Sequence, residues 1–195
     1  YEMASSMMRN LMPDEEHKVL RHTNDNESLF HAHGVEQQLE SLHNPTVALK
    51  SGGYLVINQT EALVAIDINS GKATRERSIE ETAVKTNLEA ADEIARQLKL
   101  RQMAGLVVID FIDMEERKHN AQVEKRMRDA LAGDRARIQV GRISSFGLLE
   151  LSRQRLGPSL HEIYRSTCET CGGLGHVRGN TGVIRAILRS IESSM

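Results

Sequence analysis

The chain has 195 residues, of which 39% are hydrophobic and 27% charged, and its formal net charge is −2. This is enough apolar sequence for one ordinary domain, so disorder as the main state is not expected. An aromatic content of only 3% argues against a surface that stacks many bases. No window approaches the roughly 20 apolar residues of a membrane-spanning helix, and the start lacks the regions of a signal peptide. We therefore expect a cytoplasmic location, and we expect the chain to be part of a longer protein.

The first half of the chain is predicted to form one helix followed by three strands. Apolar residues at helical spacing predict a helix over residues 28–42, and Pro45 closes it. The sequence Ser51-Gly52-Gly53 predicts a hairpin turn between the first two strands. The third strand contains an unbroken apolar run, 63–66, which is typical of a central strand covered on both faces. The predicted strands are residues 46–49, 54–57 and 62–68.

The second half is predicted to alternate helices and strands. Ser78 and Glu81 have the spacing of a capping box, and a helix follows as far as about Arg101. Its inward positions should be Val84, Leu88, Ala91, Ile94 and Leu98. Because this helix connects two strands, those strands should be parallel neighbours or near neighbours. The pattern indicates an α/β (α+β) fold with a mixed sheet and packed helices. The remaining predicted elements are strands at 106–112, 137–143 and 148–153, and helices at 115–132 and 182–191.

Two predicted apolar strands each carry an aspartate near the carboxyl end, Asp67 in one and Asp110 in the other. Side chains alternate along a strand, so Asn69 should share a face with Asp67. If the strands are neighbours, the two carboxylates meet at one sheet edge, where they repel each other unless a cation or a proton intervenes. Mg²⁺ is commonly held by one or two carboxylates together with substrate phosphate, which suits phosphodiester hydrolysis. The alternative is that both aspartates only cap the following turns.

Positive charge is concentrated in one part of the chain. Between Arg117 and Arg155 there are ten basic and four acidic residues, a net charge of +6, so the rest carries −8. Such asymmetry indicates a polyanionic partner, although solvated helix and strand faces explain it equally well.

A cysteine motif lies near the end of the chain. Cys168 and Cys171 fall in a C-x-x-C-x-G-x-G sequence, the spacing of a zinc knuckle. Structural zinc needs four ligands and the chain has only two cysteines, so we expect a twofold homodimer in which each chain gives both thiolates to one shared zinc. Completion by His176 within one chain, a redox pair and a chaperone-type zinc unit are less favoured alternatives.

These motifs, in this order, resemble the catalytic region of the ribonuclease E/G family. The resemblance covers about two thirds of the chain, from Ser51 to Gly179, and residues 28–50 fit more loosely. The motifs are SGGYLVIN, TEALVAIDINSGKATRE, IEETAVKTNLEAADEIARQL, GLVVIDFIDM, DRARIQVGRIS, FGLLELSRQR and the paired cysteines.

The resemblance implies a metal-dependent endoribonuclease that cuts single-stranded RNA to 5′-phosphate and 3′-hydroxyl ends, in RNA processing and decay. Asp67 and Asp110 match the family's magnesium-binding aspartates, and Asn69 matches their supporting asparagine. Cys168 and Cys171 match its zinc-link cysteines, and Arg137 matches a basic position implicated in RNA contact. In such an enzyme, Arg137 and Arg142 would hold the strand by phosphate contacts, which position it without reading its sequence. The parent protein would be a zinc-linked dimer or a tetramer.

The resemblance also implies how the chain is divided. Residues 1–44 would be the end of an RNase H-like subdomain, 45–163 a DNase I-like catalytic subdomain, 164–179 a zinc link and 180–195 the start of a small dimerisation domain. Glu169 stands where the family usually has proline. The family's S1 and 5′-phosphate-sensing regions have no counterpart in these residues, so the alternative function is a zinc-linked dimerisation and RNA-binding module without activity of its own.

Overall fold

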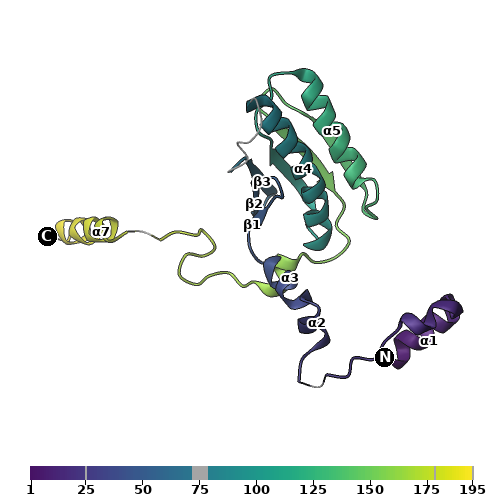
Figure 1. Ribbon diagram of the computed structural model, residues 1–195. Helices are drawn as coiled ribbons and strands as arrows, with labels where there is room; N and C mark the ends of the chain where they lie inside the picture. Colours follow the sequence, from purple (N-terminus) through teal and green to yellow (C-terminus); the bar gives the residue numbers. More distant parts are fainter. Residues whose placement is uncertain (25, 72–78, 178, 195) are drawn as a thin grey trace.

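The computed structural model describes residues 1–24, 26–71, 79–177 and 179–194, so the capping box predicted at Ser78 lies outside the described residues. Within these ranges, six strands form one mixed sheet in the order β1-β2-β3-β4-β6-β5 (Figure 1). The third and fourth strands are parallel, as the predicted crossover requires. The other neighbouring strands are antiparallel. The strands are β1 (Thr46–Ala48), β2 (Tyr54–Gln59), β3 (Val64–Asn69), β4 (Gly105–Asp110), β5 (Ile138–Ile143) and β6 (Leu148–Arg153).

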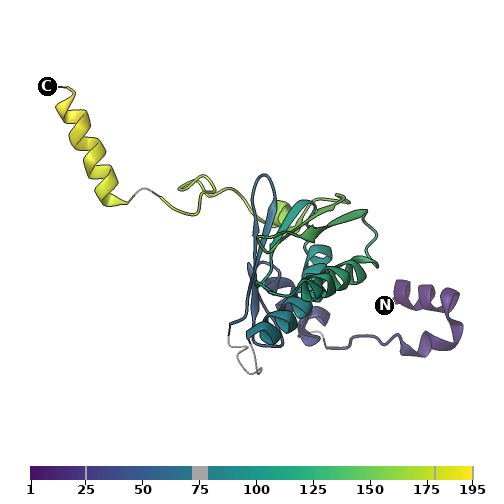
Figure 2. The ribbon, with the colours of Figure 1, turned by 90° about the horizontal axis from the view of Figure 1, so that it is seen from above.

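The helices divide into a pair that packs on the sheet and others that extend from it (Figures 1 and 2). None in the described part of the chain is long and apolar enough to cross a membrane. The helices are α1 (Glu2–Leu11), η1 (Pro13–Lys18, a 3₁₀ helix), α2 (Leu29–Ala32), α3 (Val35–Ser41), α4 (Ile79–Leu100), α5 (Arg117–Leu131), α6 (Leu160–Tyr164) and α7 (Asn180–Glu192).

The hydrophobic core lies between one face of the sheet and the pair α4 and α5. On β3, Val64, Ile66 and Ile68 are buried in this core, whereas Asp67 is exposed and Ala65 is half-buried. The prediction that this central strand is covered on both faces is therefore wrong. An apolar run of four residues does not by itself show how many layers cover a strand, because its alternate positions can remain partly open.

The inward face of α4 also differs from the prediction in its first half. Val84 and Leu88 are only half-buried, while Ala83, Thr86 and Asn87 face the core. The predicted positions Ala91, Ile94 and Leu98 are buried, as expected. Small and polar side chains let the start of α4 lie close to the loop that follows β4, which brings the helix next to the predicted site.

The predicted helix over residues 28–42 is interrupted. Gly34 adopts a left-handed conformation with φ 64°, which ends α2 and begins α3. Neither short helix contains a buried residue, so no packing maintains one continuous helix there. Helices α1 and α7 stand apart from the sheet in both views (Figures 1 and 2).

Candidate active site

Asp67 and Asp110 are brought together by the strand register. In the parallel pairing of β3 with β4, Asp67 lies directly beside Asp110. Adjacent strands are about 4.8 Å apart, so the two carboxylates occupy neighbouring positions on the sheet. Both residues are exposed, on the face that α4 and α5 leave open. The pair therefore stands at the carboxyl ends of two parallel strands, where α/β sheets commonly place ligands.

Asn69 supports this pair on the same face of β3. Its Nδ2 donates a hydrogen bond to Asp67 Oδ2 at 2.8 Å. The contact fixes one carboxylate oxygen and leaves the other oxygen of Asp67 available for a ligand.

The electrostatics of Asp110 reflect its neighbours. Partial burial raises the pKa of Asp110 above its ordinary value, and the charges of Asp67 and Asp113 raise this pKa further. Gly147 lies against this group: a Cβ there would be 3.2 Å from Asp113 Oδ1 and 3.8 Å from Asp110 Oδ1. Gly147 also has a φ of 77° and accepts a hydrogen bond from the Phe111 N–H, so a side chain at this position would disturb the acidic group.

The loop after Asp110 is held by a residue that sequence analysis missed. Asn87 on α4 is fully buried, and its amide pairs with both backbone groups of Ile112. Nδ2 donates to the Ile112 carbonyl at 2.8 Å, and Oδ1 accepts from its N–H at 3.1 Å. An asparagine on the core-facing stripe of an amphipathic helix is the sequence signal that would have pointed to such a role.

Glu80, at the start of α4, fixes the next part of the same loop. Its carboxylate accepts hydrogen bonds from the N–H groups of Glu115 and Glu116 and pairs with His119 Nδ1 at 2.6 Å. The His119 contact and these backbone donors hold the pKa of Glu80 below its usual range. Asn87 and Glu80 thus tie the loop between β4 and α5 to one rigid helix.

The donor set fits magnesium. Among the described residues, no three His, Cys, Asp or Glu side chains are grouped as a complete metal site. Two carboxylates suffice for Mg²⁺, which usually keeps several waters and takes further oxygens from substrate phosphate. The repulsion that raises the pKa of Asp110 is the interaction that a bound cation would relieve.

The two candidate arginines are placed at different ends of the sheet. Arg137 immediately precedes β5, and its backbone pairs with Gln154, the residue that follows β6. This end of β6 is remote from Asp110, which pairs with the first residue of β6. Arg142 lies at an irregularity of β5, near the end of β6 that pairs with Asp110. Both side chains are exposed. Of the two, Arg142 is therefore placed near the carboxylates.

Part of the basic excess is neutralised inside the fold. Arg153 is buried and forms an ion pair with Asp134 at 2.9 Å, the two side chains being 2% and 3% exposed. The net charge of +6 already includes both Arg153 and Asp134. It still overstates the charge that this region presents to a polyanion, because three of its cations pair with acids outside the counted stretch: Arg126 with Asp92, Lys118 with Glu116 and Arg155 with Glu162.

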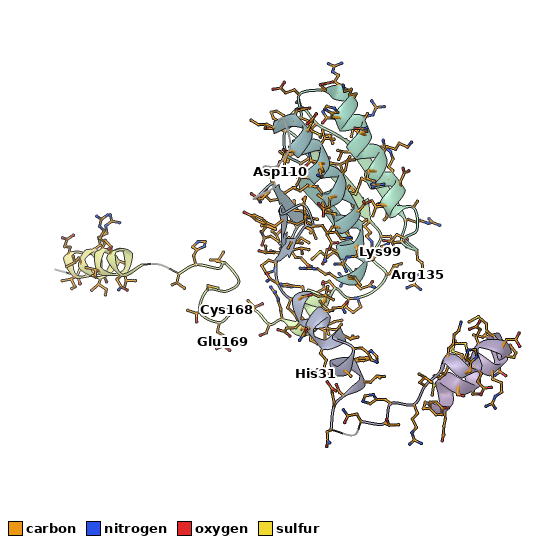
Figure 3. The ribbon with its side chains drawn as sticks, viewed as in Figure 1. His31, Lys99, Asp110, Arg135, Cys168 and Glu169 are labelled. Carbon is orange, nitrogen blue, oxygen red and sulfur yellow. The ribbon has the colours of Figure 1, made fainter. Side chains whose placement is uncertain are left out.

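The cysteines lie on the extended segment between α6 and α7, away from Asp110 (Figure 3). Both are free thiols. The Gly172 N–H bonds the Cys168 carbonyl at 2.8 Å, and the Gly175 N–H approaches Cys171 Sγ at 3.4 Å. Backbone N–H groups of Cys171 and Thr170 lower the pKa of the Cys168 thiol.

This turn presents two sulfur ligands, and the lowered pKa of Cys168 favours its thiolate form. In the described residues, no third His, Cys, Asp or Glu side chain is grouped with them. The arrangement fits half of a four-ligand zinc site.

The fold is a mixed α/β domain that places two paired carboxylates on the open face of its sheet. The sequence profile of the Ribonuclease E/G family matches residues 1–156. The chain therefore belongs to the ribonuclease E/G family.

Several relatives of known name support this assignment. The chain is 55% identical to ribonuclease E of Escherichia coli over 180 residues, 92% of this chain and 17% of that protein. It is 53% identical to ribonuclease E of Haemophilus influenzae over 192 residues, 98% of this chain and 20% of that protein. Ribonuclease G of H. influenzae is 39% identical over 92% of this chain and 36% of that protein. The chain spans about a fifth of the length of the ribonuclease E relatives.

Proposed function

We propose that this chain is the catalytic region of a metal-dependent endoribonuclease. It would hydrolyse single-stranded RNA to 5′-phosphate and 3′-hydroxyl ends, in cytoplasmic RNA processing and decay. The observation that carries the proposal is the register pairing of Asp67 with Asp110 on an open sheet face. Family membership supports the same reaction, because the related proteins are named ribonucleases.

Each residue of the site has a distinct part in this proposal. Asp67 and Asp110 would hold Mg²⁺, which when bound neutralises phosphate charge and lowers the pKa of a water that attacks phosphorus. Asn69 orients the Asp67 carboxylate through its 2.8 Å hydrogen bond. Arg142 contacts RNA phosphate beside the pair, and Arg137 contacts the strand farther along the sheet.

A small polar cavity beside the carboxylates would accommodate part of the RNA strand. It has a volume of about 180 Å³ and is lined by the loop after β4, by Asn120 and by the turn that contains Ser144, Ser145 and Gly147. Asp113 also borders it. Hydroxyl, amide and backbone groups are suited to contacting a ribose or a phosphate, so the strand would cross the pair on this side.

The test is cleavage of an end-labelled single-stranded RNA by the chain in Mg²⁺ and in magnesium-free buffer. We expect Asp67→Asn and Asp110→Asn each to lower the cleavage rate by at least about a hundredfold. A loss of this size is typical when one group that stabilises charge in the transition state is removed. Asp129→Asn, a change of the same kind on α5, is the matched control. Turnover of either site variant near the wild-type rate would contradict the proposal.

We further propose that the chain forms a homodimer through one zinc ion shared by Cys168 and Cys171 of each copy, and a tetramer in the parent protein. Two thiols in a turn rich in backbone N–H groups, with no third ligand beside them in the described residues, support a half-site. Elemental analysis and light scattering should give one zinc per two chains and a dimer that dissociates with chelator. A zinc-free monomer would contradict this assembly.

The second candidate function is an RNA-binding and zinc-linked dimerisation module without catalysis. It is favoured by the position of the cysteines on a segment separate from the sheet (Figure 3). Metal dependence distinguishes the two functions, because the enzyme needs Mg²⁺ for turnover and the module needs only zinc for assembly. RNA binding without cleavage in Mg²⁺ would favour the module.

A further inference from the structure

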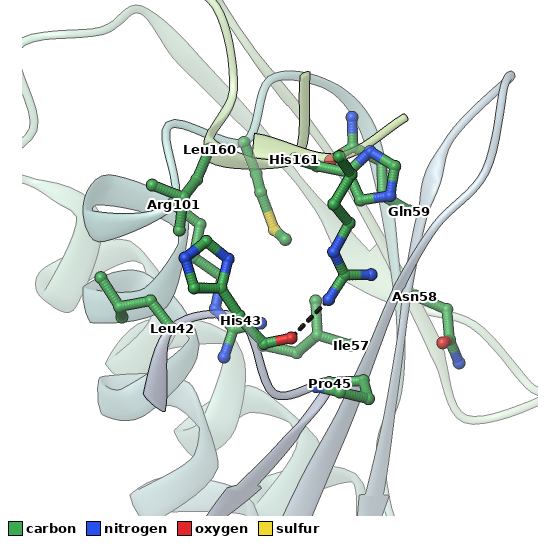
Figure 4. Close-up of a pocket in the computed structure, with 11 residues that line it drawn as sticks. Leu42, His43, Pro45, Ile57, Asn58, Gln59, Arg101, Leu160 and His161 are labelled. Atoms are coloured by element: carbon green, nitrogen blue, oxygen red, sulfur yellow. Dashed lines mark hydrogen bonds between the residues drawn. The ribbon is translucent and has the colours of Figure 1, made fainter. Parts of the chain in front are cut away.

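A second polar cavity lies at the opposite end of the sheet from the carboxylate pair. It has a volume of about 150 Å³ and sits between the end of α3, the end of β2, the end of α4 and α6 (Figure 4). Its lining contains two arginines, two histidines and no carboxylate: Arg101, Arg165, His43 and His161. Gln59, at the end of β2 that borders the cavity, is level with Val64 of β3 and Val107 of β4, three residues before Asp110.

Arg101 is a buried cation whose direct partners are all neutral. The residue is only 5% exposed. Its Nε donates to Gln97 Oε1 at 2.6 Å, and its Nη2 donates to the Asn44 carbonyl at 2.9 Å. Burial lowers the pKa of Arg101, and the nearby charge of Arg165 lowers it further. A buried charge is costly unless an opposite charge accompanies it, so this guanidinium is suited to an anionic partner.

Arg165 brings a second guanidinium to the cavity without bringing a carboxylate. Its Nη2 donates to the His43 carbonyl, the contact drawn as a dashed line in Figure 4. The charge of Glu93 acts on Arg101, but Glu93 does not line the cavity: it accepts a hydrogen bond from Gln97 and pairs with Arg96 at 2.7 Å. Among the described residues, the two cavity arginines therefore have no direct carboxylate partner.

Gln59 adds an unfulfilled hydrogen-bonding group to the same cavity. Its Oε1 is buried and has no hydrogen-bond partner among the described residues, while Nε2 makes a contact of 3.4 Å to Ser159 Oγ. Turning this amide would present its N–H groups to an anion. A phosphate has five heavy atoms, and a cavity of this size is known to hold benzene, which has six.

We propose that this cavity binds a phosphate group of single-stranded RNA, at a subsite remote from the cleavage site. Guanidinium groups match phosphate oxygens in pairs, and the histidines add further donors. The inference rests on the proposed function, because it takes the polyanion to be the RNA substrate. A strand held at this subsite would be anchored at the other end of the strands that carry the carboxylates.

The test is binding of a fluorescent single-stranded RNA to the full 195-residue chain in magnesium-free buffer, measured by anisotropy. We expect Arg165→Gln to weaken binding by about fivefold or more, as for loss of a charged hydrogen bond. The plot of the logarithm of the binding constant against the logarithm of the salt concentration should also become shallower by about 0.7. This is the value for loss of one phosphate contact to single-stranded nucleic acid. Arg155→Gln is the control, since it removes an exposed arginine of the same segment that pairs with Glu162 outside the cavity.

Equal losses in the two variants would overturn the proposal, because they would show a general effect of charge. Unchanged binding by Arg165→Gln would overturn it as well. An assay that needs no variant follows the imidazole NMR signals of His43 and His161 during titration with RNA and, separately, with inorganic phosphate. Both ligands should shift these signals, and a shift with inorganic phosphate alone would exclude RNA as the source of the phosphate.

Failure of this inference is distinguishable from failure of the proposed function. If cleavage depends on Asp67 and Asp110 but RNA binding is unchanged in Arg165→Gln, the proposed function stands and only the remote subsite is contradicted. If the arginines serve solely to hold the carbonyls of His43 and Asn44, Arg165→Gln will lower thermal stability without changing the RNA affinity of the folded protein, and that result would also overturn the subsite.

Discussion

Helices α4 and α7 are both amphipathic, but only α4 has its apolar face covered. Nine residues of α4 are buried against the sheet and α5, whereas α7 has no buried residue. The apolar row of α7 is 43–56% exposed and comprises Val183, Ile184, Ile187, Leu188 and Ile191. A helical pattern therefore specifies a helix and its apolar side, while the neighbours of that side decide how much stability it contributes.

The largest effect should come from a buried ion pair within the sheet domain. Asp134→Asn leaves the buried guanidinium of Arg153 without its charged partner, and we expect a loss of about 3–5 kcal/mol in unfolding free energy. Urea denaturation measures this loss. The comparison is the exposed ion pair of Arg155 with Glu162. Glu162→Gln should lower the unfolding free energy by less than about 1.5 kcal/mol, a figure that includes the part of Glu162 in the capping box of α6.

The same pair should give the sheet domain part of its acid sensitivity. Burial works against ionisation of Asp134, but hydrogen bonds from Arg153 and Ala136 outweigh burial and lower its pKa. A carboxyl whose pKa is lower in the folded state stabilises the folded protein at pH values above the ordinary pKa of the group. This stabilisation is lost as the pH falls toward the pKa in the folded state. Unfolding at pH 3 and pH 7 should therefore differ less in Asp134→Asn than in wild type. An equal difference would contradict this role.

The next effect compares the two helices by one substitution. Ile94→Ala on α4 should lower the unfolding free energy by about 3 kcal/mol, because it opens a cavity beside fully buried neighbours. Ile187→Ala on α7 should change it by less than about 0.5 kcal/mol, since this side chain is 54% exposed. Chemical denaturation of both variants under conditions that keep the chain monomeric measures the contrast. Similar losses would show that the face of α7 is covered in solution.

A somewhat smaller effect is expected at the polar contact behind the site. Asn87→Ala leaves both backbone groups of Ile112 without partners, which should cost about 2 kcal/mol. Because the loop after Asp110 would lose its tether, RNA cleavage should also decline in the fraction that remains folded. The control is Asn180→Ala, at the exposed start of α7. Full activity of Asn87→Ala would show that the tether does not position the carboxylates.

The smallest effect should have the opposite sign. Without divalent cations, Asp110→Asn removes a carboxylate that Asp67 and Asp113 repel, so we expect a gain in stability of less than about 1 kcal/mol. The same type of substitution thus destabilises the protein at Asp134 and slightly stabilises it at Asp110. Thermal unfolding of the two variants measures the difference. A marked loss at Asp110 would mean that its charge supports the fold.

The sequence by itself determined the alternation of strands and helices, the parallel orientation of β3 and β4 and the position of two aspartates at the ends of these strands. These features follow from local periodicity and from the handedness of crossover connections, which act within short stretches of chain. The family resemblance was also available from the sequence, because its motifs are long and keep their order. The roles of Asp67, Asp110 and the cysteines remain predictions.

Only the tertiary structure decided which groups face one another across the chain. It placed Asn87 against Ile112, buried Arg153 with Asp134, and separated Arg137 from Arg142 along the sheet. It also left one face of β3 open and gathered the arginines of the second cavity from segments 64 residues apart. Such contacts depend on the packing of distant segments, and a residue's type and local pattern do not specify its partner.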